Sequence, residues 1–339
     1  MARRLEAAGI SFHLIGDCAA PAAYKVAAGV INPVTGRWMT KSWEIDQLLP
    51  VAEKTYREIE ATFGIEIYHP ISLLRYCQNA ADAKRLGRRM RNPRYANVLG
   101  RYIPPGEGHP DLEDTQGSFE IQGAAYVNLP LLIETLQSHY RTGSQLTDQP
   151  FDYTRLKTTS GLWTYDNIQA QRVVFCEGVG LSQNPWFGSL PFTPAKGETL
   201  ILQADQLNLP ETLYHHKKWI LPYGDHRFRI GATYDESDLS PEPTPAGRAE
   251  LMQAVESFIR PKIDWQIESH LAGIRPTTPD AKPLLGAHPT EAGLYILNGL
   301  GSKGASLAPL MSDWLFQHIY KDVPLSESVD IQRFESPCD

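Results

Sequence analysis

The 339-residue sequence lacks a long hydrophobic run. No stretch approaches the roughly 18 consecutive apolar residues that a transmembrane helix requires. The first residues, Met1 to Glu6, also lack the apolar segment of a signal peptide. Hydrophobic residues make up 42% of the chain and charged residues 21%, a composition that excludes disorder over most of its length. We therefore expect no membrane span, a cytoplasmic location and about two domains.

Cysteine is scarce as well. The four cysteines are scattered, and no pair has the C-x-x-C spacing of a zinc or redox motif: they are Cys18, Cys77, Cys176 and Cys338. This pattern predicts reduced thiols and no metal site. The adjacent histidines His215 and His216 lack a third ligand nearby in the sequence, so we interpret them as a surface pair.

Excess positive charge is absent too. The formal net charge is −7, which argues against a dedicated nucleic-acid-binding protein, so a nucleic-acid partner is not expected. One local exception is the segment 84–94, where six of eleven residues are basic. Such a run is typical of a solvated helix face, and contact with phosphate or RNA is the alternative interpretation.

Hydrophobic periodicity predicts helices and strands in a particular order. Helices are expected over 1–8, 43–63, 129–140, 249–259 and 306–320. Strands are expected over 11–16, 71–75, 172–176, 199–203, 218–221, 228–233 and 294–298, and a surface loop over 102–117. Strand–helix units at both ends therefore enclose an antiparallel middle. This order predicts an α/β, Rossmann-like dinucleotide domain with an inserted antiparallel-sheet domain.

The predicted domains are discontinuous. The dinucleotide-binding domain is expected to comprise 1–70, 120–190 and 262–339. The antiparallel-sheet, substrate-binding domain is expected to comprise 71–119 and 191–261.

The segment Gly299–Gly304 (GLGSKG) matches G-x-G-x-x-G, follows a predicted strand and opens a predicted helix. No convincing strand ending in an acidic residue follows that helix, which argues against a nicotinamide-dinucleotide fingerprint. A glycine-rich turn at a helix N-terminus can instead stabilise negative charge on the pyrimidine edge of a reduced flavin. A tight turn without a ligand is the alternative interpretation.

Two further polar residues are candidates for binding. Arg275 lies in GIRPTTPDAKPLLG, where neighbouring prolines restrict the backbone, and a constrained guanidinium suits a carboxylate ligand. A structural arginine bound to buried carbonyls is the alternative. Asp17 ends the first predicted strand, where a dinucleotide fold places the carboxylate that binds a ribose hydroxyl. The alternative there is a loop or N-cap aspartate.

Five segments in this order resemble the FAD-dependent D-amino-acid oxidase superfamily, and in particular its glycine-oxidase-like branch. They are A-x-x-L-x-x-x-G followed by Asp17; AAGVINP at 27–33; VVFCEG at 173–178 followed by PAKGE at 194–198; ILP at 220–222 with IGAT at 230–233; and GIRPTTPD at 273–280 followed by NGLGSKG at 298–304. Together they cover nearly the whole chain.

The resemblance implies non-covalent FAD, because no cysteine lies between Arg275 and Gly304, where relatives with covalent flavin attach it. It implies a cofactor site made of Asp17, Ala28, Gly29, Asn32, Gly178, Gly299, Gly301, Ser302, Lys303, Gly304 and Ala305. It also implies that Arg275 holds the substrate carboxylate. Trp219 occupies a position at which relatives often carry a substrate-binding tyrosine, and Tyr234 is a further pocket candidate.

The chain departs from the family at its start. Relatives begin with a strand and a G-x-G-x-x-G turn that cradle the FAD pyrophosphate, and this sequence begins after them. We expect the chain to be truncated with respect to the family and to lack those phosphate donors.

The expected function is FAD-dependent oxidation of a C–N bond in a small amino acid or amine. The substrate carbon passes a hydride to flavin N5, and O₂ or another acceptor reoxidises the flavin, which carries the chemistry. No protein group is expected to act as a catalytic acid or base. Two alternatives remain: a tRNA-modifying flavin oxidase of the same superfamily, and a truncated, non-catalytic flavin-fold protein.

Overall fold

The computed structural model describes residues 1–334 of the chain. Contacts divide the chain into two compact units. The first unit comprises 1–23, 130–195 and the chain from 274 onward, and the second comprises 24–129 and 196–273. These boundaries differ from the predicted domain boundaries mainly because 24–70 belong with the second unit. The predicted roles of the two domains remain predictions.

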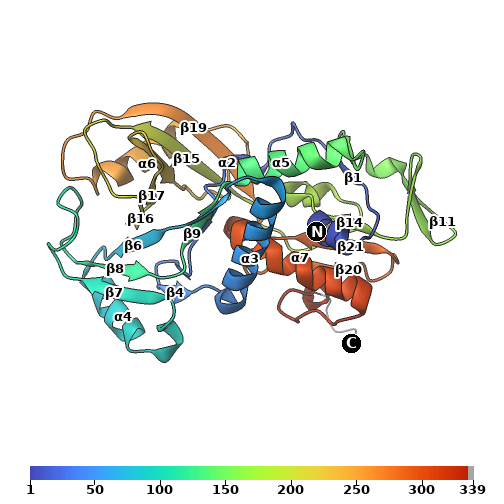
Figure 1. Ribbon diagram of the computed structural model, residues 1–339, viewed down its shortest axis with the longest axis horizontal. Coiled ribbons are helices and arrows are strands. Elements are labelled where there is room, and N and C mark those ends of the chain that lie inside the picture. The colour runs from blue at the N-terminus through green and yellow to red at the C-terminus, as the bar shows by residue number, and fades with distance from the viewer. Residues whose placement is uncertain (335–339) are drawn as a thin grey trace. The chain divides into compact units, whose positions relative to one another are not determined.

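The first unit is built on short parallel strands. β1 (Leu14–Gly16) pairs in parallel with β10 (Leu146–Asp148), and β14 (Val173–Phe175) pairs in parallel with β21 (Leu294–Asn298). β20 (Leu284–Ala287) continues the second sheet by antiparallel pairing with β21. Helix α7 (Gly304–Lys321) contacts β20 and β21, and α1 (Ala2–Ala7) contacts α7 (Figure 1).

Other elements complete this unit. They are α5 (Leu129–Thr142), the antiparallel strands β11 (Leu156–Thr159), β12 (Leu162–Tyr165) and β13 (Ile168–Ala170), and the 3₁₀ helices η2 (Tyr153–Arg155), η3 (Gly178–Gln183), η4 (Gly301–Lys303) and η5 (Ile331–Phe334). Aromatic rings fill its core: Phe175 stacks on Trp186 with ring centres 5.5 Å apart and contacts Phe187 edge-on. Such dense aromatic burial stabilises the ends of β14 and β21.

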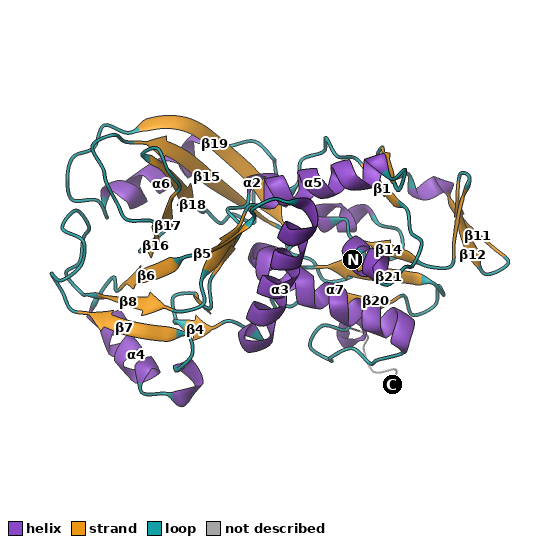
Figure 2. Ribbon diagram, in the orientation of Figure 1, coloured by secondary structure: helices purple, strands orange, loops and turns teal. Residues whose placement is uncertain are grey.

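The second unit contains an eight-stranded sheet in the order β19-β15-β18-β17-β16-β6-β8-β7 (Figure 2). The strands are β19 (Gln266–Arg275), β15 (Ala195–Gln203), β18 (Arg227–Gly231), β17 (Trp219–Pro222), β16 (Thr212–His215), β6 (Ser72–Tyr76), β8 (Ser118–Ile121) and β7 (Leu99–Ile103). Pairing is antiparallel from β15 to β16 and from β6 to β7, whereas β16 and β6 run parallel.

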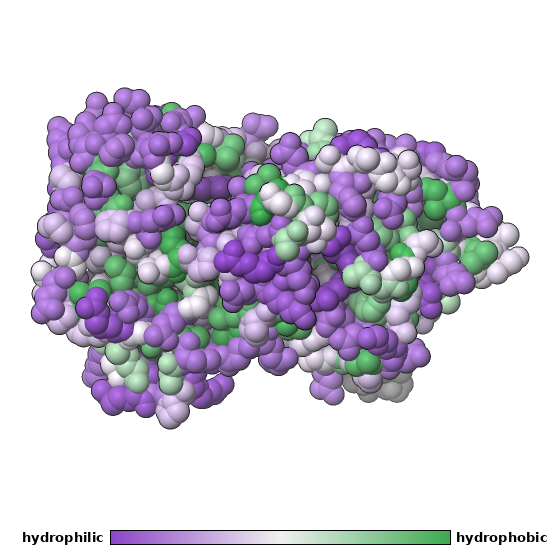
Figure 3. Space-filling view, viewed as in Figure 1, coloured by the Kyte–Doolittle hydropathy of each residue, from purple (hydrophilic) through white to green (hydrophobic). Residues whose placement is uncertain are grey.

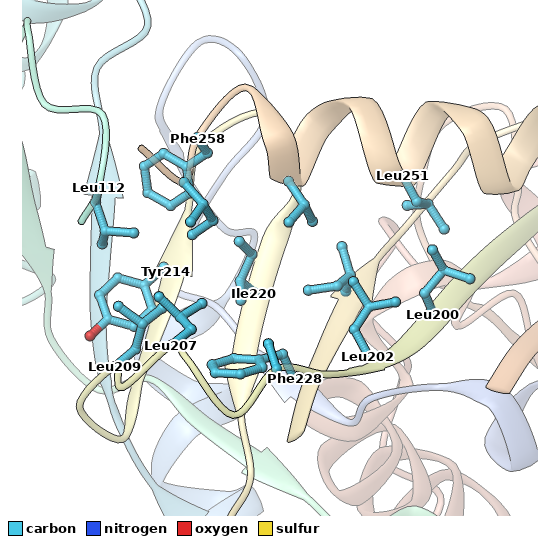
Figure 4. Packing of buried hydrophobic residues seen from close by; sticks show 14 of the residues in the cluster. Leu112, Leu200, Leu202, Leu207, Leu209, Tyr214, Ile220, Phe228, Leu251 and Phe258 are labelled. Carbon is cyan, nitrogen blue, oxygen red and sulfur yellow. The ribbon is translucent and has the colours of Figure 1, made fainter. Parts of the chain in front are cut away.

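Helix α6 (Pro245–Glu256) covers one face of this sheet. Thr244 caps the helix by accepting a hydrogen bond from the Gly247 backbone at 3.0 Å. Its buried side chains pack on alternate residues of β15, β17 and β18 (Figure 4); the cluster includes Leu200, Leu202, Ile220, Phe228, Ile230, Leu251 and Phe258. Since alternate strand residues point to opposite faces, Thr199, Trp219 and Arg229 lie on the other face.

Smaller elements surround the large sheet. They are α2 (Ala23–Val26), α3 (Ile45–Phe63), α4 (Ala80–Met90), η1 (Pro93–Tyr95), the sheet of β2 (Val30–Ile31), β9 (Ala125–Val127) and β5 (Tyr68–Pro70), and the pair β3 (Val34–Thr35) and β4 (Thr40–Lys41). α3 buries Leu48, Ala52 and Tyr56 on one side, and its outer side is strongly hydrophilic (Figure 3). Among the described residues, no helix is long and apolar enough to cross a membrane.

The predicted mixed α/β class is confirmed, and every predicted helix is present with small shifts at its ends. Two expectations need correction. His215 and His216 are not a surface pair: both are partly buried, and His216 stacks on Phe258 with ring centres 4.9 Å apart. The expected surface loop at 102–117 buries Leu112 and Asp114, because Leu112 belongs to the core beneath α6.

Candidate functional site

The carboxyl ends of the parallel strands β14 and β21 lie side by side in the first unit. Gly178, three residues after β14, has a left-handed backbone with φ of +57°. Its carbonyl accepts a hydrogen bond from Asn298 Nδ2 at 2.9 Å. Asn298 is the last residue of β21, and its side-chain oxygen accepts from the Gly299 N–H at 2.8 Å. The two turns therefore meet at the sheet edge where ligands bind in open α/β folds.

The Gly299–Gly304 turn packs closely against the chain that follows Arg275. Gly299 and Gly301 have φ values of +70° and +53°. A β-carbon at Gly299 would lie 2.9 Å from Thr278 Cγ2, closer than real contacts allow. The Gly301 N–H also donates to the Pro276 carbonyl at 3.0 Å. The glycines thus permit a close approach that joins the end of β19 to the turn.

The N-terminus of α7 opens directly from this turn. Lys303 occupies the N-cap position and makes no side-chain capping hydrogen bond. Burial lowers the pKa of Lys303. A helix N-terminus presents N–H groups and partial positive charge, and a lysine adds to it. This donor set fits a ring edge rich in carbonyl oxygens, such as the pyrimidine side of a flavin.

A partly buried carboxyl group supports the Gly178 turn. Glu177 accepts hydrogen bonds from the Tyr153 hydroxyl at 2.7 Å and from Asn184 Nδ2 at 2.8 Å. Burial raises the pKa of Glu177, and the two hydrogen bonds oppose that shift. Asn184 in turn accepts from the Trp186 and Phe187 backbones, both at 2.9 Å. The sequence analysis did not identify this network, because its members are joined only through the folded turn.

Asp17 lies at the end of β1, as predicted. Its side chain is exposed, and Oδ1 accepts hydrogen bonds from the backbones of Ala19 at 2.8 Å and Ala20 at 3.1 Å. Asp148, at the end of the parallel strand β10, accepts from the Cys18 backbone and from Arg141, both at 2.9 Å. Two carboxylates thus mark this sheet edge. Asp148 was missed because its role depends on the β1–β10 pairing.

In the second unit, Gly29 lies against β9. Its φ is +67°, and a β-carbon there would lie 1.9 Å from the Val127 carbonyl oxygen. Its own carbonyl accepts from the Val127 N–H at 3.0 Å. Asn32 holds the next turn by accepting from the Val34 backbone at 3.0 Å. Only glycine fits at position 29, so the conformation of the loop that includes Ala28 is tightly specified.

Trp219 lies on the face of the large sheet opposite α6. Residues Trp219 and Gly231 are directly paired across β17 and β18. A β-carbon at Gly231 would lie 2.4 Å from Trp219 Cζ2, so the indole covers this glycine. Tyr234, three residues beyond β18, is an exposed aromatic residue with 56% of its surface accessible.

The predicted site residues therefore fall into groups. The first unit brings together Gly178, the end of β19 at Arg275, and the turn with its following helix, namely Gly299, Gly301, Ser302, Lys303, Gly304 and Ala305. Asp17 lies in the same unit at the end of β1. The second unit holds Ala28, Gly29, Asn32, Trp219 and Tyr234. The binding roles assigned to all of these residues remain predictions.

Within residues 1–334, no disulfide joins Cys18, Cys77 or Cys176. Cys338 lies outside the described residues.

Comparisons with known proteins agree with this fold. The chain is similar to glycine oxidase from Bacillus subtilis, with 31% identity over 158 residues that span 45% of this chain and 41% of that protein. It is also similar to the tRNA 5-methylaminomethyl-2-thiouridine biosynthesis bifunctional protein MnmC from Marinobacter nauticus, with 35% identity over 166 residues, or 45% of this chain and 26% of that protein. The matches thus span less than half the length of these curated relatives.

A solved structure matches over almost the full length. The crystal structure of iminodiacetate oxidase from Chelativorans sp. BNC1 superposes with a TM-score of 0.78 at 25% identity, covering 97% of this chain and 95% of that one.

The family model described as FAD dependent oxidoreductase matches residues 1–318. This match and the glycine oxidase similarity confirm the predicted superfamily and branch, and with them the class of cofactor that the family uses. The chain belongs to the FAD-dependent oxidoreductase family.

Proposed function

We propose that this chain binds FAD non-covalently and oxidises a C–N bond in a small amino acid or amine. The observation that carries the proposal is the convergence of the Gly178 turn, the Gly299–Gly304 turn and the segment after Arg275 at the carboxyl ends of β14 and β21. Ligands of α/β folds bind at this edge. We also propose that the protein is located in the cytoplasm.

The chain offers suitable partners for the cofactor. Asp17 would bind the ribose, and Gly178 would lie near the dinucleotide. The α7 N-terminus, with Gly301, Ser302, Lys303, Gly304 and Ala305, would stabilise negative charge on the pyrimidine side. The cofactor roles of Ala28, Gly29 and Asn32, which belong to the second unit, stay predictions. Bound FAD would supply the acceptor for the hydride that leaves the substrate carbon next to nitrogen, with O₂ or another acceptor regenerating it.

The substrate is held by the chain's own side chains. Arg275 would form a bidentate hydrogen-bonded pair with the substrate carboxylate, because its guanidinium fork matches carboxylate geometry. The substrate-binding roles of Trp219 and Tyr234, which belong to the second unit, stay predictions. The names of two relatives, a glycine oxidase and an iminodiacetate oxidase, support a small amine that carries a carboxylate.

The proposal is tested by the visible absorption of the purified protein and by kinetics. The expected result is a yellow protein whose flavin is bleached anaerobically by a small amino acid. Arg275→Met should raise KM for carboxylate substrates by roughly 100-fold, as expected for loss of a charge-assisted pair. Arg155→Met removes an arginine from an exposed ion pair with Asp166 and should leave KM unchanged.

Two outcomes contradict the proposal. If Arg275→Met keeps the wild-type KM, Arg275 does not bind the substrate carboxylate. A colourless protein that does not take up added FAD would instead favour the non-catalytic alternative.

A second candidate function is oxidation of a modified tRNA. One surface of the second unit favours it: α4 is rich in basic residues, and the exposed Trp38 lies between Arg37 and Arg85, each 4.8 Å from its ring. Stacked aromatic and arginine side chains are typical of RNA contacts. The name of the MnmC relative supports the same function.

A gel-shift titration with tRNA tests this candidate. Binding that is lost in the double variant Arg88→Ala, Arg89→Ala would support it. No shift with the wild-type protein at low salt would exclude it.

A further inference from the structure

Residues 276–283, which we call the linker loop, join Arg275 to β20 within the first unit. Thr278 is buried in this loop, and its hydroxyl donates to the Lys282 carbonyl at 2.7 Å, which closes the loop on itself. The loop also packs on the glycine turn, because a β-carbon at Gly299 would lie 2.9 Å from Thr278 Cγ2. The linker loop therefore connects the end of β19 to that turn through direct contacts.

One residue of the linker loop has an unfavourable backbone conformation. Ala281 adopts a φ of +54°, in the left-handed region that residues with a β-carbon rarely occupy. On either side of it, Asp280 Oδ1 accepts a hydrogen bond from the Lys282 N–H at 3.0 Å. A residue in such a conformation persists only where its surroundings hold it in place. The linker loop therefore requires contacts from the rest of the unit.

Arg333, which belongs to η5, supplies several such contacts. Its Nε lies 2.8 Å from Asp280 Oδ2, and its Nη2 lies 3.4 Å from Asp280 Oδ1. Nη2 also donates to the carbonyls of Pro283 at 3.0 Å and Lys282 at 3.5 Å. Burial would raise the pKa of Asp280, but the hydrogen bonds from Arg333 and Lys282 keep that pKa below its usual value. One guanidinium thus holds the linker loop both before and after Ala281.

The segment that carries Arg333 is itself fixed to β20. The Leu285 N–H donates to the Val329 carbonyl at 2.9 Å, and both residues are fully buried. A β-carbon at Gly286 would lie 3.0 Å from Ile331 Cγ1, so the segment packs closely against the strand. Arg333 therefore joins the linker loop to a well-packed part of the unit.

We propose that Arg333 is a positioning residue, which holds the linker loop so that Arg275 lies where it can bind the substrate carboxylate. The inference rests on the proposed function and adds a residue that acts through Arg275. Two contacts between a guanidinium and a carboxylate fix geometry as well as providing attraction. Such precision matters, because a displacement of about 1 Å at a binding group can cost roughly 100-fold in rate.

The test is a double-mutant cycle on FAD-loaded enzyme with glycine as the substrate. Arg333→Met should raise KM by roughly 3- to 30-fold, the range of coupling within one hydrogen-bond network, and leave kcat within about 2-fold. In the Arg275→Met background, Arg333→Met should change KM by less than about 2-fold, because its effect passes through Arg275. Arg333→Lys keeps the charge without the planar fork and should recover part of the loss.

A matched control is available in the same unit. Arg155 Nε lies 2.8 Å from Asp166 Oδ1, so Arg155→Met breaks the same kind of pair and should keep the wild-type KM. Asp280→Asn breaks the pair from the side of the linker loop and keeps Arg333. It should raise KM in the same direction, and it serves as the test if Arg333→Met does not fold.

Calorimetric titration with acetate, a carboxylate without an amine, gives a readout independent of turnover. The dissociation constant of acetate should rise in Arg333→Met by the same factor as KM. Additive effects of the two substitutions, or lower stability in Arg333→Met with unchanged KM and acetate affinity, would overturn the inference and leave Arg333 a structural residue. If Arg275→Met itself keeps the wild-type KM, the proposed role of Arg275 fails first, in a variant that retains Arg333.

Discussion

The two faces of the eight-stranded sheet differ in how they accommodate charge. On the α6 face, Lys196 is 1% exposed, and its Nζ lies 2.6 Å from Asp238 Oδ2. Glu198 on the same strand lies 2.7 Å from His270 Nε2 and accepts from the Thr244 hydroxyl at 2.8 Å. On the opposite face, Arg229 is partly exposed, and its hydrogen bond within residues 1–334 goes to the Val26 carbonyl. The fully buried Lys196 therefore has a carboxylate partner, whereas Arg229 keeps partial contact with water.

The largest expected loss of stability is on the α6 face, where the buried charges are paired. Lys196→Met removes the lysine that lies 4.0 Å from the buried Glu198 carboxylate, and breaking a buried pair costs about 3–5 kcal/mol. The hydrogen bond from Lys196 lowers the pKa of Asp238 to about 2, as a formed ion pair requires. Urea unfolding measures the loss. Lys54→Met, an exposed lysine 3.8 Å from Glu58, is the control and should change stability by less than about 0.5 kcal/mol. A loss below about 1 kcal/mol in Lys196→Met would mean that pairing does not stabilise this face.

A smaller loss of stability is expected at the contact between Glu198 and helix α6. A β-carbon at Gly247 would lie 2.4 Å from the Glu198 carboxyl carbon, so Gly247→Ala must displace that group and should cost about 1–3 kcal/mol. Gly87→Ala is the matched control in helix α4, where the nearest atom would be 3.8 Å away. There the substitution should stabilise by about 0.5–1 kcal/mol, the ordinary helix preference. Equal effects of the two variants would contradict the role of the close approach.

Some of this arrangement follows from the sequence, and some does not. The Gly299–Gly304 turn and its helix are local, so their motif predicts both. The helix of α3 is predicted by the spacing of Leu48, Ala52 and Tyr56. By contrast, Glu198 and Gly247 are 49 positions apart, and nothing in either segment indicates their contact. Arg229 resembles any strand arginine until the pairing of β15, β18 and β17 places Ile201 and Leu221 beside it.

The two adjacent histidines, His215 and His216, allow a further comparison through the pH dependence of stability. Burial, with a contribution from Arg75, lowers the pKa of His215 to about 3, and burial, with a contribution from Lys217, lowers that of His216 to about 4. Each folded-state pKa lies below the unfolded value of 6.5, so the unfolded state takes up protons first. Stability is therefore complete above pH 6.5 and falls as the pH decreases toward about 4 for His216 and about 3 for His215.

Unfolding titrations of His216→Phe and His215→Phe measure these contributions. Each variant should flatten the dependence of unfolding free energy on pH, in its own window. His216→Phe retains an aromatic ring against Phe258, so its stability at neutral pH should be close to that of the wild type. An unchanged slope in both variants would show that neither histidine is held neutral.

The smallest effect is expected for Arg229→Met, the same kind of change as Lys196→Met on the other face. The variant loses one hydrogen bond to Val26 but also removes a partly buried cation that has no ion pair among residues 1–334. These terms oppose one another, so stability should stay within about 1 kcal/mol of the wild type. A loss as large as that of Lys196→Met would instead mean that Arg229 stabilises the fold as strongly as a buried ion pair does.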